Sequence, residues 1–262
     1  MDSHEIVNRI MHQRRQRFPS KVPGLGANMS AACRVDGRQL RVAFASAAPG
    51  CAAQLVAGVL DHSVRRHLDV TWTVIPTLPG ESELAAALRA RAFLQEEGQR
   101  MMALAGPLVV APTPQVTIAP IRGLQAMRSY EYGSRGAFFD DPQPAPDVVE
   151  RRAHERLREL ESGWCRYFAA QVAGRPVGGC YYTQYEIVPT IMGVYTIPAA
   201  QRQGVASALL AYVVGELLAS GQHVSCLYVR HGNPAERLYA HLGFLPLFDE
   251  YTFSRASLDE HL

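Results

Sequence analysis

Residues 194–221 read VYTIPAAQRQGVASALLAYVVGELLASG, and this stretch determines how the surrounding elements can be arranged. Residues 191–197 are apolar and rich in β-branched side chains, which is typical of a buried strand. Pro198 ends the strand, because proline has no N–H to donate to a ladder. Apolar side chains recur at helical spacing after Gly204 and stop near Gly221, so the stretch predicts a strand, a tight polar turn and a helix.

A polar turn in front of a helix forms a site for an anion. The first turn of a helix has unpaired N–H groups, and the helix dipole favours negative charge there. Gly204 allows a ligand to approach the backbone, and Ala206 keeps the next turn small. Arg202 adds a fixed positive charge. We therefore expect a phosphate or pyrophosphate group to bind at this turn.

Two motifs carry a resemblance to a known family. The turn has the form Gln201-x-x-Gly204-x-Ala206, which resembles the (Gln/Arg)-x-x-Gly-x-(Gly/Ala) motif of the GNAT superfamily, the acyl-CoA-dependent N-acyltransferases. The turn alone is also compatible with an ordinary link between a strand and a helix. A second strand and a short helix follow, and they resemble a later part of the same superfamily. The marked positions of this second motif are Asn233, Tyr239, Gly243 and Phe244.

The resemblance implies an α/β (α+β) fold with a mixed, mostly antiparallel twisted sheet flanked by helices. From residue 116 onward we expect the GNAT order of a strand, two helices, three strands, a helix, a strand, a helix and a strand. Three prolines within residues 106–115 mark a boundary. We therefore expect a GNAT N-acetyltransferase domain over residues 115–262, preceded by a smaller α/β lobe over residues 1–110.

The first lobe resembles the degenerate half-domain that precedes the catalytic domain in some two-part GNAT proteins. Its marked positions are occupied by Trp72, Pro76, Leu84, Leu88 and Phe93. The elements expected are helices over residues 3–18, 51–68 and 83–98 and strands over residues 39–45, 69–75 and 100–105. We find no second phosphate motif there, and a separate structural lobe is an equal alternative.

The resemblance also implies acetyl-CoA as the cosubstrate. In GNAT enzymes the central strand bulges and splays from its neighbour, so its free backbone groups pair with the pantetheine arm and polarise the thioester carbonyl. That role falls to Val194, Tyr195 and Thr196, and Asn233 would hydrogen-bond the arm or a nearby water. The residues expected at the pyrophosphate are Gln201, Arg202, Gln203, Gly204, Val205, Ala206 and Ser207.

Acetyl transfer produces a thiolate, which usually takes up a proton. Tyr239 matches the tyrosine that protonates the departing sulfur in this superfamily, and packing beside Leu238 is the alternative role. If residues 235–242 form a helix, Leu238 and Leu242 lie four residues apart and should face the core. Tyr239 would then be rotated away from them, toward the gap where the thioester is expected.

The attacking amine must lose its proton, so the reaction needs a base or a water relay at neutral pH. Glu186 precedes the central strand, near where several GNAT proteins place an acidic residue, and it is our candidate base. His231 and Glu250 are further candidates, and an exposed loop position is the alternative reading for Glu186 and His231. A chain of water molecules to backbone carbonyls would leave no trace in the sequence.

The composition is that of an ordinary globular protein, with 48% hydrophobic and 19% charged residues among 262. A net charge of +2 is too small to indicate a nucleic-acid or membrane partner. Five cysteines without a C-x-x-C pair indicate reduced thiols in a cytoplasmic protein. No metal-ligand cluster stands out, so we expect no metal. The sequence contains neither the pattern of a signal peptide nor an apolar run of membrane-spanning length.

The resemblance thus implies an N-acetyltransferase that moves an acetyl group from acetyl-CoA to a primary amine by direct attack in a ternary complex. A non-catalytic acyl-CoA-binding or sensor module is the alternative, because no base is evident. A structural protein that binds no CoA is a third possibility. We expect the acceptor to be a small-molecule or peptide amine. No residue pattern identifies which amine it is, and none indicates the oligomeric state.

Overall fold

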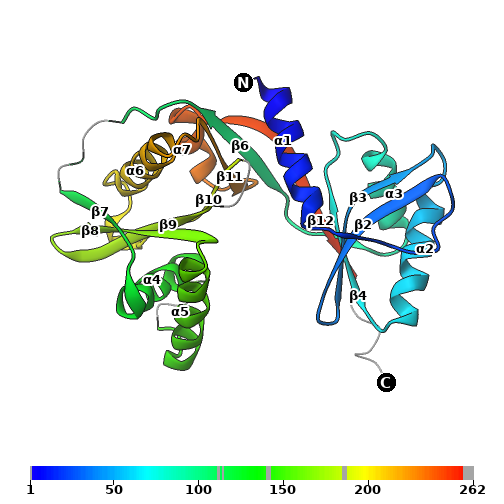
Figure 1. Cartoon of the computed structure of the whole chain (residues 1–262), viewed down its shortest axis with the longest axis horizontal. Coiled ribbons are helices and arrows are strands. Elements are labelled where there is room, and N and C mark those ends of the chain that lie inside the picture. Colours follow the sequence, from blue (N-terminus) through cyan, green and yellow to red (C-terminus); the bar gives the residue numbers. More distant parts are fainter. Residues whose placement is uncertain (1, 111–112, 114, 140–142, 185–187, 256–262) are drawn as a thin grey trace. The chain divides into compact units, whose positions relative to one another are not determined.

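The computed structural model describes residues 2–110, 113, 115–139, 143–184 and 188–255 (Figure 1). The chain divides into two compact units that interleave in sequence. The first unit consists of Met1–Met101, Val229–Asn233 and Pro246–Leu262, and the second consists of Met102–Tyr228 and Pro234–Leu245. Compact units are defined by packing, whereas domains are defined by independent folding. The division into domains 1–110 and 115–262 therefore stays a prediction.

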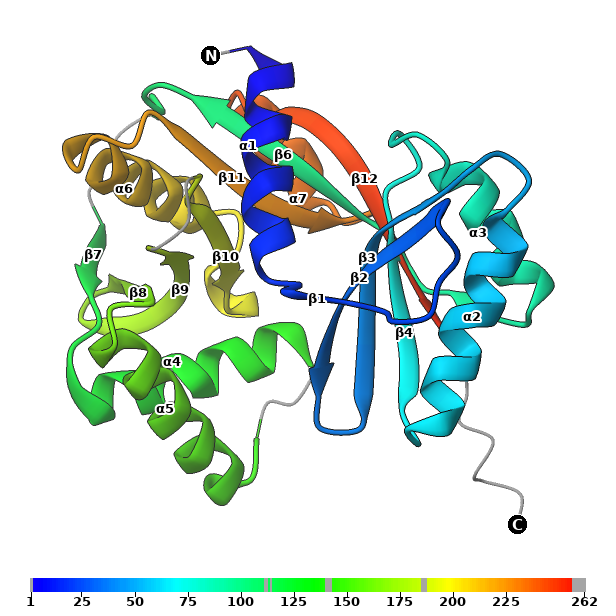
Figure 2. The same ribbon diagram turned by 45° about the vertical axis from the view of Figure 1, so that its right-hand side comes forward.

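The first unit is a sheet with two helices packed on it. β3 pairs in antiparallel with β2 and in parallel with β4, and β4 pairs on its other side with β12. α2 and α3 pack side by side against this sheet (Figures 1 and 2). The elements are α1 (Ser3–Gln16), β1 (Ser20–Lys21), β2 (Met29–Asp36), β3 (Gln39–Ala47), α2 (Ala52–Arg65), β4 (Asp69–Val74), α3 (Glu81–Ala90), β5 (Leu94–Gln95) and β12 (Leu245–Ser254).

The core of the first unit follows from alternation along β4. Val70, Trp72 and Val74 are buried, and the residues between them are half-buried. Trp72 is fully buried in a cluster with apolar side chains from β3, α2 and α3. The alternation in residues 69–75 therefore predicted this strand correctly.

The helix expected over residues 83–98 is wrong at its end. α3 stops at Ala90, and residues 94–95 pair with β12 as a short strand. Ala92 has a left-handed backbone, with a φ of 60°, which breaks the helix. Phe93 then enters the core, where only 2% of its surface is exposed. Local composition favours a longer helix, but the burial of this aromatic ring outweighs the preference.

From residue 116 onward the elements follow the expected order, and all but the last strand, β12, are described with the second unit. β7, β8, β9 and β10 pair in antiparallel sequence, and β10 pairs in parallel with β11. The elements are β6 (Gln99–Ala105), β7 (Val116–Pro120), α4 (Gly123–Phe138), α5 (Pro146–Glu161), β8 (Cys165–Val172), β9 (Arg175–Thr183), β10 (Thr190–Thr196), η1 (Pro198–Ala200), α6 (Val205–Ala219), β11 (Val224–Arg230) and α7 (Ala235–His241). The fold class predicted from the sequence, a mixed and mostly antiparallel sheet flanked by helices, is confirmed.

Neighbouring glycines in β9 show how closely helices pack on this sheet. A Cβ atom on Gly178 would lie 3.0 Å from Val205 of α6, whereas one on Gly179 would lie 2.7 Å from Tyr130 of α4. Adjacent strand residues point to opposite faces, so α6 and α4 cover opposite faces of β9 (Figure 1).

The sequence of residues 133–147, with Asp140-Asp141-Pro142 and two further prolines, indicates a loop, but this prediction is wrong in its first part, because α4 continues to Phe138. Gly133 lies within this helix, where its missing side chain serves packing. A Cβ atom there would lie 2.8 Å from the Tyr195 ring. The glycine therefore lets α4 approach β10 closely.

Glu81 is a buried acid at the start of α3, with 3% of its surface exposed. Burial raises the pKa of its carboxyl from 4.5 to about 8, although a hydrogen bond from the Ile75 backbone opposes the shift. Below pH 4.5 the folded and unfolded states are both protonated, so stability is fully retained. Between pH 4.5 and about 8 only the unfolded state releases the proton, and the first unit should lose roughly 2–4 kcal/mol.

We expect Glu81→Gln to remove most of this loss, because the amide has no proton to release. The measurement is urea denaturation at about pH 5 and about pH 8, followed by fluorescence. A Trp164→Phe background leaves Trp72 as the reporter, since the chain has two tryptophans. Glu97→Gln changes an exposed acid of the same unit and is the control. An unchanged pH dependence in Glu81→Gln would contradict the assignment.

Candidate active site

The turn between β10 and α6 has the backbone of an anion site. β10 ends at Thr196, and η1 leads from it to residues 201–204. Arg202 and Gly204 have left-handed backbone, with φ angles of 63° and 78°. Left-handed residues at alternating positions curl the chain so that successive N–H groups converge. Gly204 is the N-cap of α6 and adopts this conformation without a steric cost.

The first turn of α6 leaves its N–H groups without internal partners. Among the described residues, no backbone carbonyl accepts from the amides of residues 203–207. The first helical bond runs from Ala208 N to Gly204 O, at 2.9 Å. Residues 201–204 are exposed. The turn therefore presents a row of free amides at the positive end of the α6 dipole, which suits a phosphate.

Two glutamines brace this turn with their side chains. Gln201 Nε2 donates to Thr196 O at 3.4 Å, and Gln203 Nε2 donates to Ala199 O at 3.1 Å. Both residues were predicted to hold the pyrophosphate. Their side-chain amides already donate to backbone carbonyls of this chain. Their backbone N–H groups are therefore the more available donors for a phosphate.

Thr113 is a neighbour of the turn that the sequence did not reveal. A Cβ atom on Gly204 would lie 3.1 Å from Thr113 Oγ1. The prolines around Thr113 indicated only a boundary. Its hydroxyl adds a polar group beside Gly204, and the contact also explains why a side chain at position 204 would crowd the turn.

β10 bulges and separates from β11, as the resemblance implied. Its register against β9 shifts between Met192 and Tyr195, and Gly193 within the bulge has a φ of 60°. Among the described residues of the two strands, β10 pairs with β11 only at Thr190 and Ile191. The edge of β10 from Met192 onward is therefore not used by β11, and its backbone groups can pair with an extended ligand.

Thr196 and Tyr195 point to opposite sides of this edge. Thr196 Oγ1 is a buried oxygen with no hydrogen-bond partner among the described residues. Tyr195 is directed at α4, where its hydroxyl donates to Tyr130 O at 3.2 Å. An orphaned hydroxyl and a free strand edge beside an anion site fit a ligand with a polar arm and phosphates. CoA has both, so the residues present fit CoA.

Tyr239 is the buried residue of α7, with 5% of its surface exposed. Leu238 and Leu242 are only half-buried, so the expectation that they face the core in its place is wrong. Burial raises the pKa of the Tyr239 hydroxyl to about 12, and Cys180 contributes in the same direction. The phenol therefore keeps its proton at neutral pH and can donate it.

A family comparison covers both motifs. Residues 133–244 match the model of the Acetyltransferase (GNAT) family, and this segment contains the turn before α6 and Tyr239. This segment of the chain is similar to a GNAT domain. No curated protein matches the sequence.

Solved structures share the GNAT fold over most of the chain. A GCN5-related N-acetyltransferase from Kribbella flavida is 16% identical with a TM-score of 0.67, over 97% of this chain and 95% of its own. One from Sphaerobacter thermophilus is 19% identical with a TM-score of 0.66, over 87% and 76%. A tandem GNAT protein from the clavulanic acid biosynthesis pathway is 14% identical with a TM-score of 0.65, over 87% and 78%. At these identities the likeness establishes the fold.

The second unit, which holds most of the residues matched to the GNAT family, contains a pocket of about 210 Å³ beside the β10 bulge. Its lining comes mostly from α4 and α5, and Gly193 of the bulge closes one side. A Cβ atom on Gly193 would lie 3.2 Å from the Tyr130 hydroxyl, so the pocket and the bulge are in direct contact. The lining residues are Tyr130, Glu131, Ser134, Arg135, Phe138, Phe139, Arg152, Arg156, Tyr181 and Gly193.

Arg156 organises the inner wall of this pocket. Its guanidinium forms an ion pair with Glu131, whose side chain is 3% exposed. It also lies over the rings of Tyr130, Tyr167 and Tyr181 at 5.8, 5.6 and 5.5 Å. The buried charge is thus balanced by one carboxylate and by aromatic faces.

Asn233 lies in the exposed turn that precedes α7 of the GNAT domain. The residue types Asn233-Pro234 predict an N-cap at Asn233 and a helix from Pro234, but this is wrong by one residue, because Pro234 is the N-cap and α7 begins at Ala235. The proposed contact of Asn233 with the pantetheine arm stays a prediction. Glu186, the candidate base, lies outside the described residues.

The other two candidate bases belong to the first unit. His231 stacks on Tyr251 at 5.7 Å and lies 3.7 Å from Asp249. Glu250 is 6% exposed and pairs with Arg14 at 2.6 Å. These contacts give both side chains a structural role in that unit.

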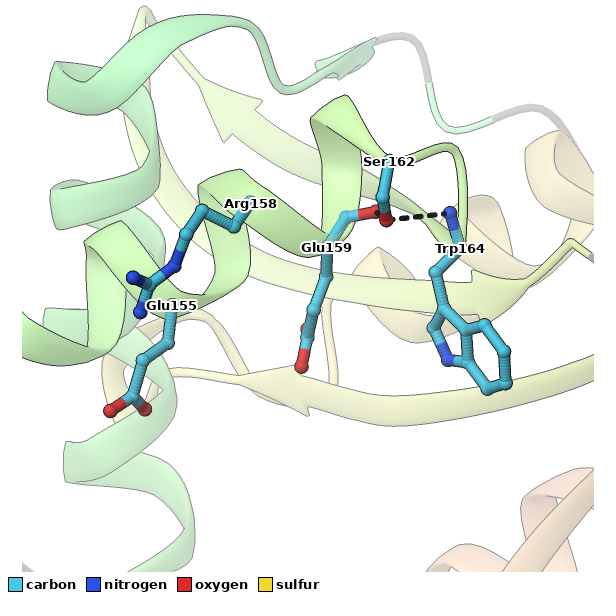
Figure 3. A pocket seen from close by; sticks show the side chains of 5 residues that line it. All are labelled: Glu155, Arg158, Glu159, Ser162 and Trp164. Atoms are coloured by element: carbon cyan, nitrogen blue, oxygen red, sulfur yellow. Dashed lines mark hydrogen bonds between the residues drawn. The ribbon is translucent and has the colours of Figure 1, made fainter. Parts of the chain in front are cut away.

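A second hollow, of about 450 Å³, lies at the end of α5 and the start of β8. Figure 3 shows the Glu159 carboxylate and the Trp164 indole pointing to the same side, while Ser162 Oγ accepts from the Trp164 amide at 3.3 Å. No residue of β10 or of the turn lines this hollow. The hollow is therefore separate from the candidate site at β10 and the turn before α6.

Neither a metal centre nor a membrane-spanning helix is evident among the described residues. Across the residues that the structure describes, no group of three or more His, Cys, Asp and Glu side chains is placed to hold a metal ion. None of the described helices combines the length and the apolar character that crossing a bilayer requires.

Proposed function

We propose that the GNAT domain transfers an acetyl group from acetyl-CoA to a primary amine by direct attack in a ternary complex. The observation that carries this proposal is the row of free amides at residues 203–207, directly after a strand that bulges and separates from its neighbour. In this proposal the amides and Arg202 bind the pyrophosphate, and the free edge of β10 pairs with the pantetheine arm.

The chemistry is an aminolysis of a thioester. The amine nitrogen bonds to the carbonyl carbon, and the bond from that carbon to sulfur breaks. Backbone N–H groups of the bulge, at residues 194–196, are proposed to bind the oxyanion. Tyr239 is proposed to protonate the leaving sulfur, since its hydroxyl keeps a proton at neutral pH. Glu186 or a water relay is proposed to take the proton of the amine.

The first unit is proposed to be a degenerate GNAT-like lobe without a CoA site of its own. We place the protein in the cytoplasm, because its five cysteines are all free and four of them are buried. The acceptor is proposed to be a small-molecule or peptide amine.

The proposal predicts acetyl-CoA-dependent acetylation of at least one amine in a panel of amino acids, polyamines, aminoglycosides and lysine peptides. Thiol release from acetyl-CoA is measured first, and mass spectrometry then looks for a product heavier by one acetyl group. Calorimetry with CoA provides a readout that does not depend on the acceptor. Tight CoA binding without turnover of any amine would replace this proposal with the alternative of an acyl-CoA-binding or sensor module.

A further inference from the structure

The charged side chains of the pocket beside the β10 bulge are already engaged with the protein itself. Arg156 forms the ion pair with Glu131, and Arg152 donates to Glu155 at 3.0 Å. Arg135 lies over an aromatic ring at 5.1 Å and makes a further interaction. Recognition of an acceptor in this pocket therefore falls to its aromatic rings and to its uncharged polar groups.

The Tyr130 hydroxyl is an uncharged polar group at the bulge. Tyr130 lines the pocket, although only 2% of its surface is exposed. A Cβ atom on Gly193 would lie 3.2 Å from this hydroxyl, whereas Tyr181 presents ring carbons to the same point, at 3.0 and 3.3 Å. The hydroxyl therefore lies where the pocket meets the bulge, next to the backbone that is proposed to bind the oxyanion.

Tyr130 differs from the phenols packed around it, because its hydroxyl has no partner of its own. The Tyr167 hydroxyl donates to Glu159 and accepts from Arg156, and the Tyr195 hydroxyl donates to the backbone carbonyl of Tyr130. The Tyr130 hydroxyl makes no hydrogen bond to any residue that the structure describes. Buried polar groups nearly always have a partner, so an unpaired hydroxyl at a pocket points to a ligand.

The ring of Tyr130 is held in place, so its hydroxyl is presented at a fixed position. The rings of Tyr167 and Tyr195 meet it edge to face at 5.5 and 5.4 Å, and the Arg156 guanidinium lies over it at 5.8 Å. Burial raises the pKa of the hydroxyl well above its ordinary value, and Arg156 opposes the rise. The phenol therefore keeps its proton at neutral pH, which suits a hydrogen-bonding group rather than a base.

We infer that the Tyr130 hydroxyl binds the nitrogen of the acceptor, and that the acceptor is a small primary amine with an apolar body. This inference rests on the proposed function and deepens it. The phenol oxygen accepts a hydrogen bond from an N–H of the amine, which turns the lone pair of the nitrogen toward the thioester carbonyl at the bulge. The rings of Tyr181, Phe138 and Phe139 pack on the carbon skeleton, and a volume of about 210 Å³ limits the acceptor to a small molecule.

Tyr130→Phe removes the hydroxyl and keeps the ring, so it isolates the hydrogen bond. With phenethylamine and isoamylamine as acceptors, we expect kcat/KM for the amine to fall by roughly 10-fold, the effect of one lost hydrogen bond. The affinity for CoA and the midpoint of urea denaturation should stay unchanged. The pH profile of kcat/KM should keep its shape, because the phenol does not titrate near neutral pH. An unchanged kcat/KM in the folded variant would overturn the role of Tyr130, and a preference for spermidine, a longer polycation, would overturn the apolar body.

Tyr182→Phe is the matched control for the lost phenol. Tyr182 follows Tyr181 on β9 but does not line the pocket. Its ring stacks on Phe168 at 5.8 Å, on the opposite face of the strand. Acceptor kinetics in Tyr182→Phe should therefore match those of the wild type. An equal fall of kcat/KM in Tyr182→Phe and Tyr130→Phe would contradict the assignment.

Binding without turnover separates this inference from the proposed function. Calorimetry with phenethylamine and isoamylamine, in the presence of CoA, compares the wild type with Tyr130→Phe. If no amine is acetylated but one of these amines binds, and its affinity drops roughly 10-fold in Tyr130→Phe, the proposed function fails and the amine site at Tyr130 stands. If amines are acetylated with equal kcat/KM by both proteins, the inference fails alone. A wild type that neither acetylates nor binds either amine would overturn it as well.

Discussion

Replacing Gly204 with glutamate should weaken CoA binding by roughly 100-fold or more, which corresponds to about 2.8 kcal/mol. Two effects act together. The position has a left-handed φ of 78°, and a Cβ atom would lie 3.1 Å from Thr113 Oγ1, so the turn must distort. The carboxylate would also sit among the amides proposed to bind the pyrophosphate, where like charges repel. Calorimetry with CoA measures the loss.

The same helix provides a control for this variant. Gly215 is exposed in α6, and a Cβ atom there meets nothing within 4 Å. Gly215→Glu therefore adds the same charge to the same helix and should leave CoA affinity unchanged. Gly204→Asn tests the backbone separately, because asparagine tolerates a left-handed conformation and brings no charge. A folded Gly204→Glu protein that binds CoA with wild-type affinity would remove the turn from the proposed site.

Tyr239→Phe should lower the rate at saturating substrates by roughly 10²–10⁴-fold, the range for general acid catalysis. CoA affinity should stay close to that of the wild type, because the hydroxyl acts only when sulfur departs. The ring stays in place, packed 6.1 Å from Phe244, so the fold should not change. Single-turnover kinetics with an accepted amine measure the chemical step directly.

Tyr212→Phe is the matched control for a lost phenol. Tyr212 lies on α6 with its ring 5.8 Å from Phe168, and its removal should leave turnover unchanged. The pH dependence gives a second check. With a pKa of about 12, the Tyr239 hydroxyl stays protonated throughout the usual assay range, so it should add no alkaline loss of rate below about pH 10. A single-turnover rate in Tyr239→Phe equal to that of the wild type would leave this tyrosine as packing alone.

The sequence predicted those parts of the site whose conformation depends on residues close together in the chain. The strand, the turn at Gly204 and the start of α6 depend on local backbone preferences, so the residue types at these positions are enough to predict them. The alternation around Trp72 is local in the same sense. Val194 and its neighbours were placed on a splayed strand by resemblance, and the register of β10 agrees with that placement.

The pocket beside the β10 bulge could not be predicted, because it is assembled by tertiary contacts. Arg156 and Glu131 lie on different helices, and neither is marked by a motif. The Asp and Pro residues after position 139 indicated a loop from residue 133, but α4 continues to Phe138 and packs at Gly133 against the Tyr195 ring. The burial of Tyr239 was misjudged because helical spacing identifies an apolar face but does not decide which neighbour covers it.

The pairing of β4 with β12 has a consequence for the order of events during synthesis. Val74 lies opposite Tyr251, and Trp72 lies opposite Phe253, so the sheet of the first unit needs a strand made much later. A ribosome adds residues from the N-terminus onward, and pairing between distant segments is slow. While the GNAT domain is being translated, the nascent first unit would expose the edge of β4, and a chaperone bound there would protect it from aggregation.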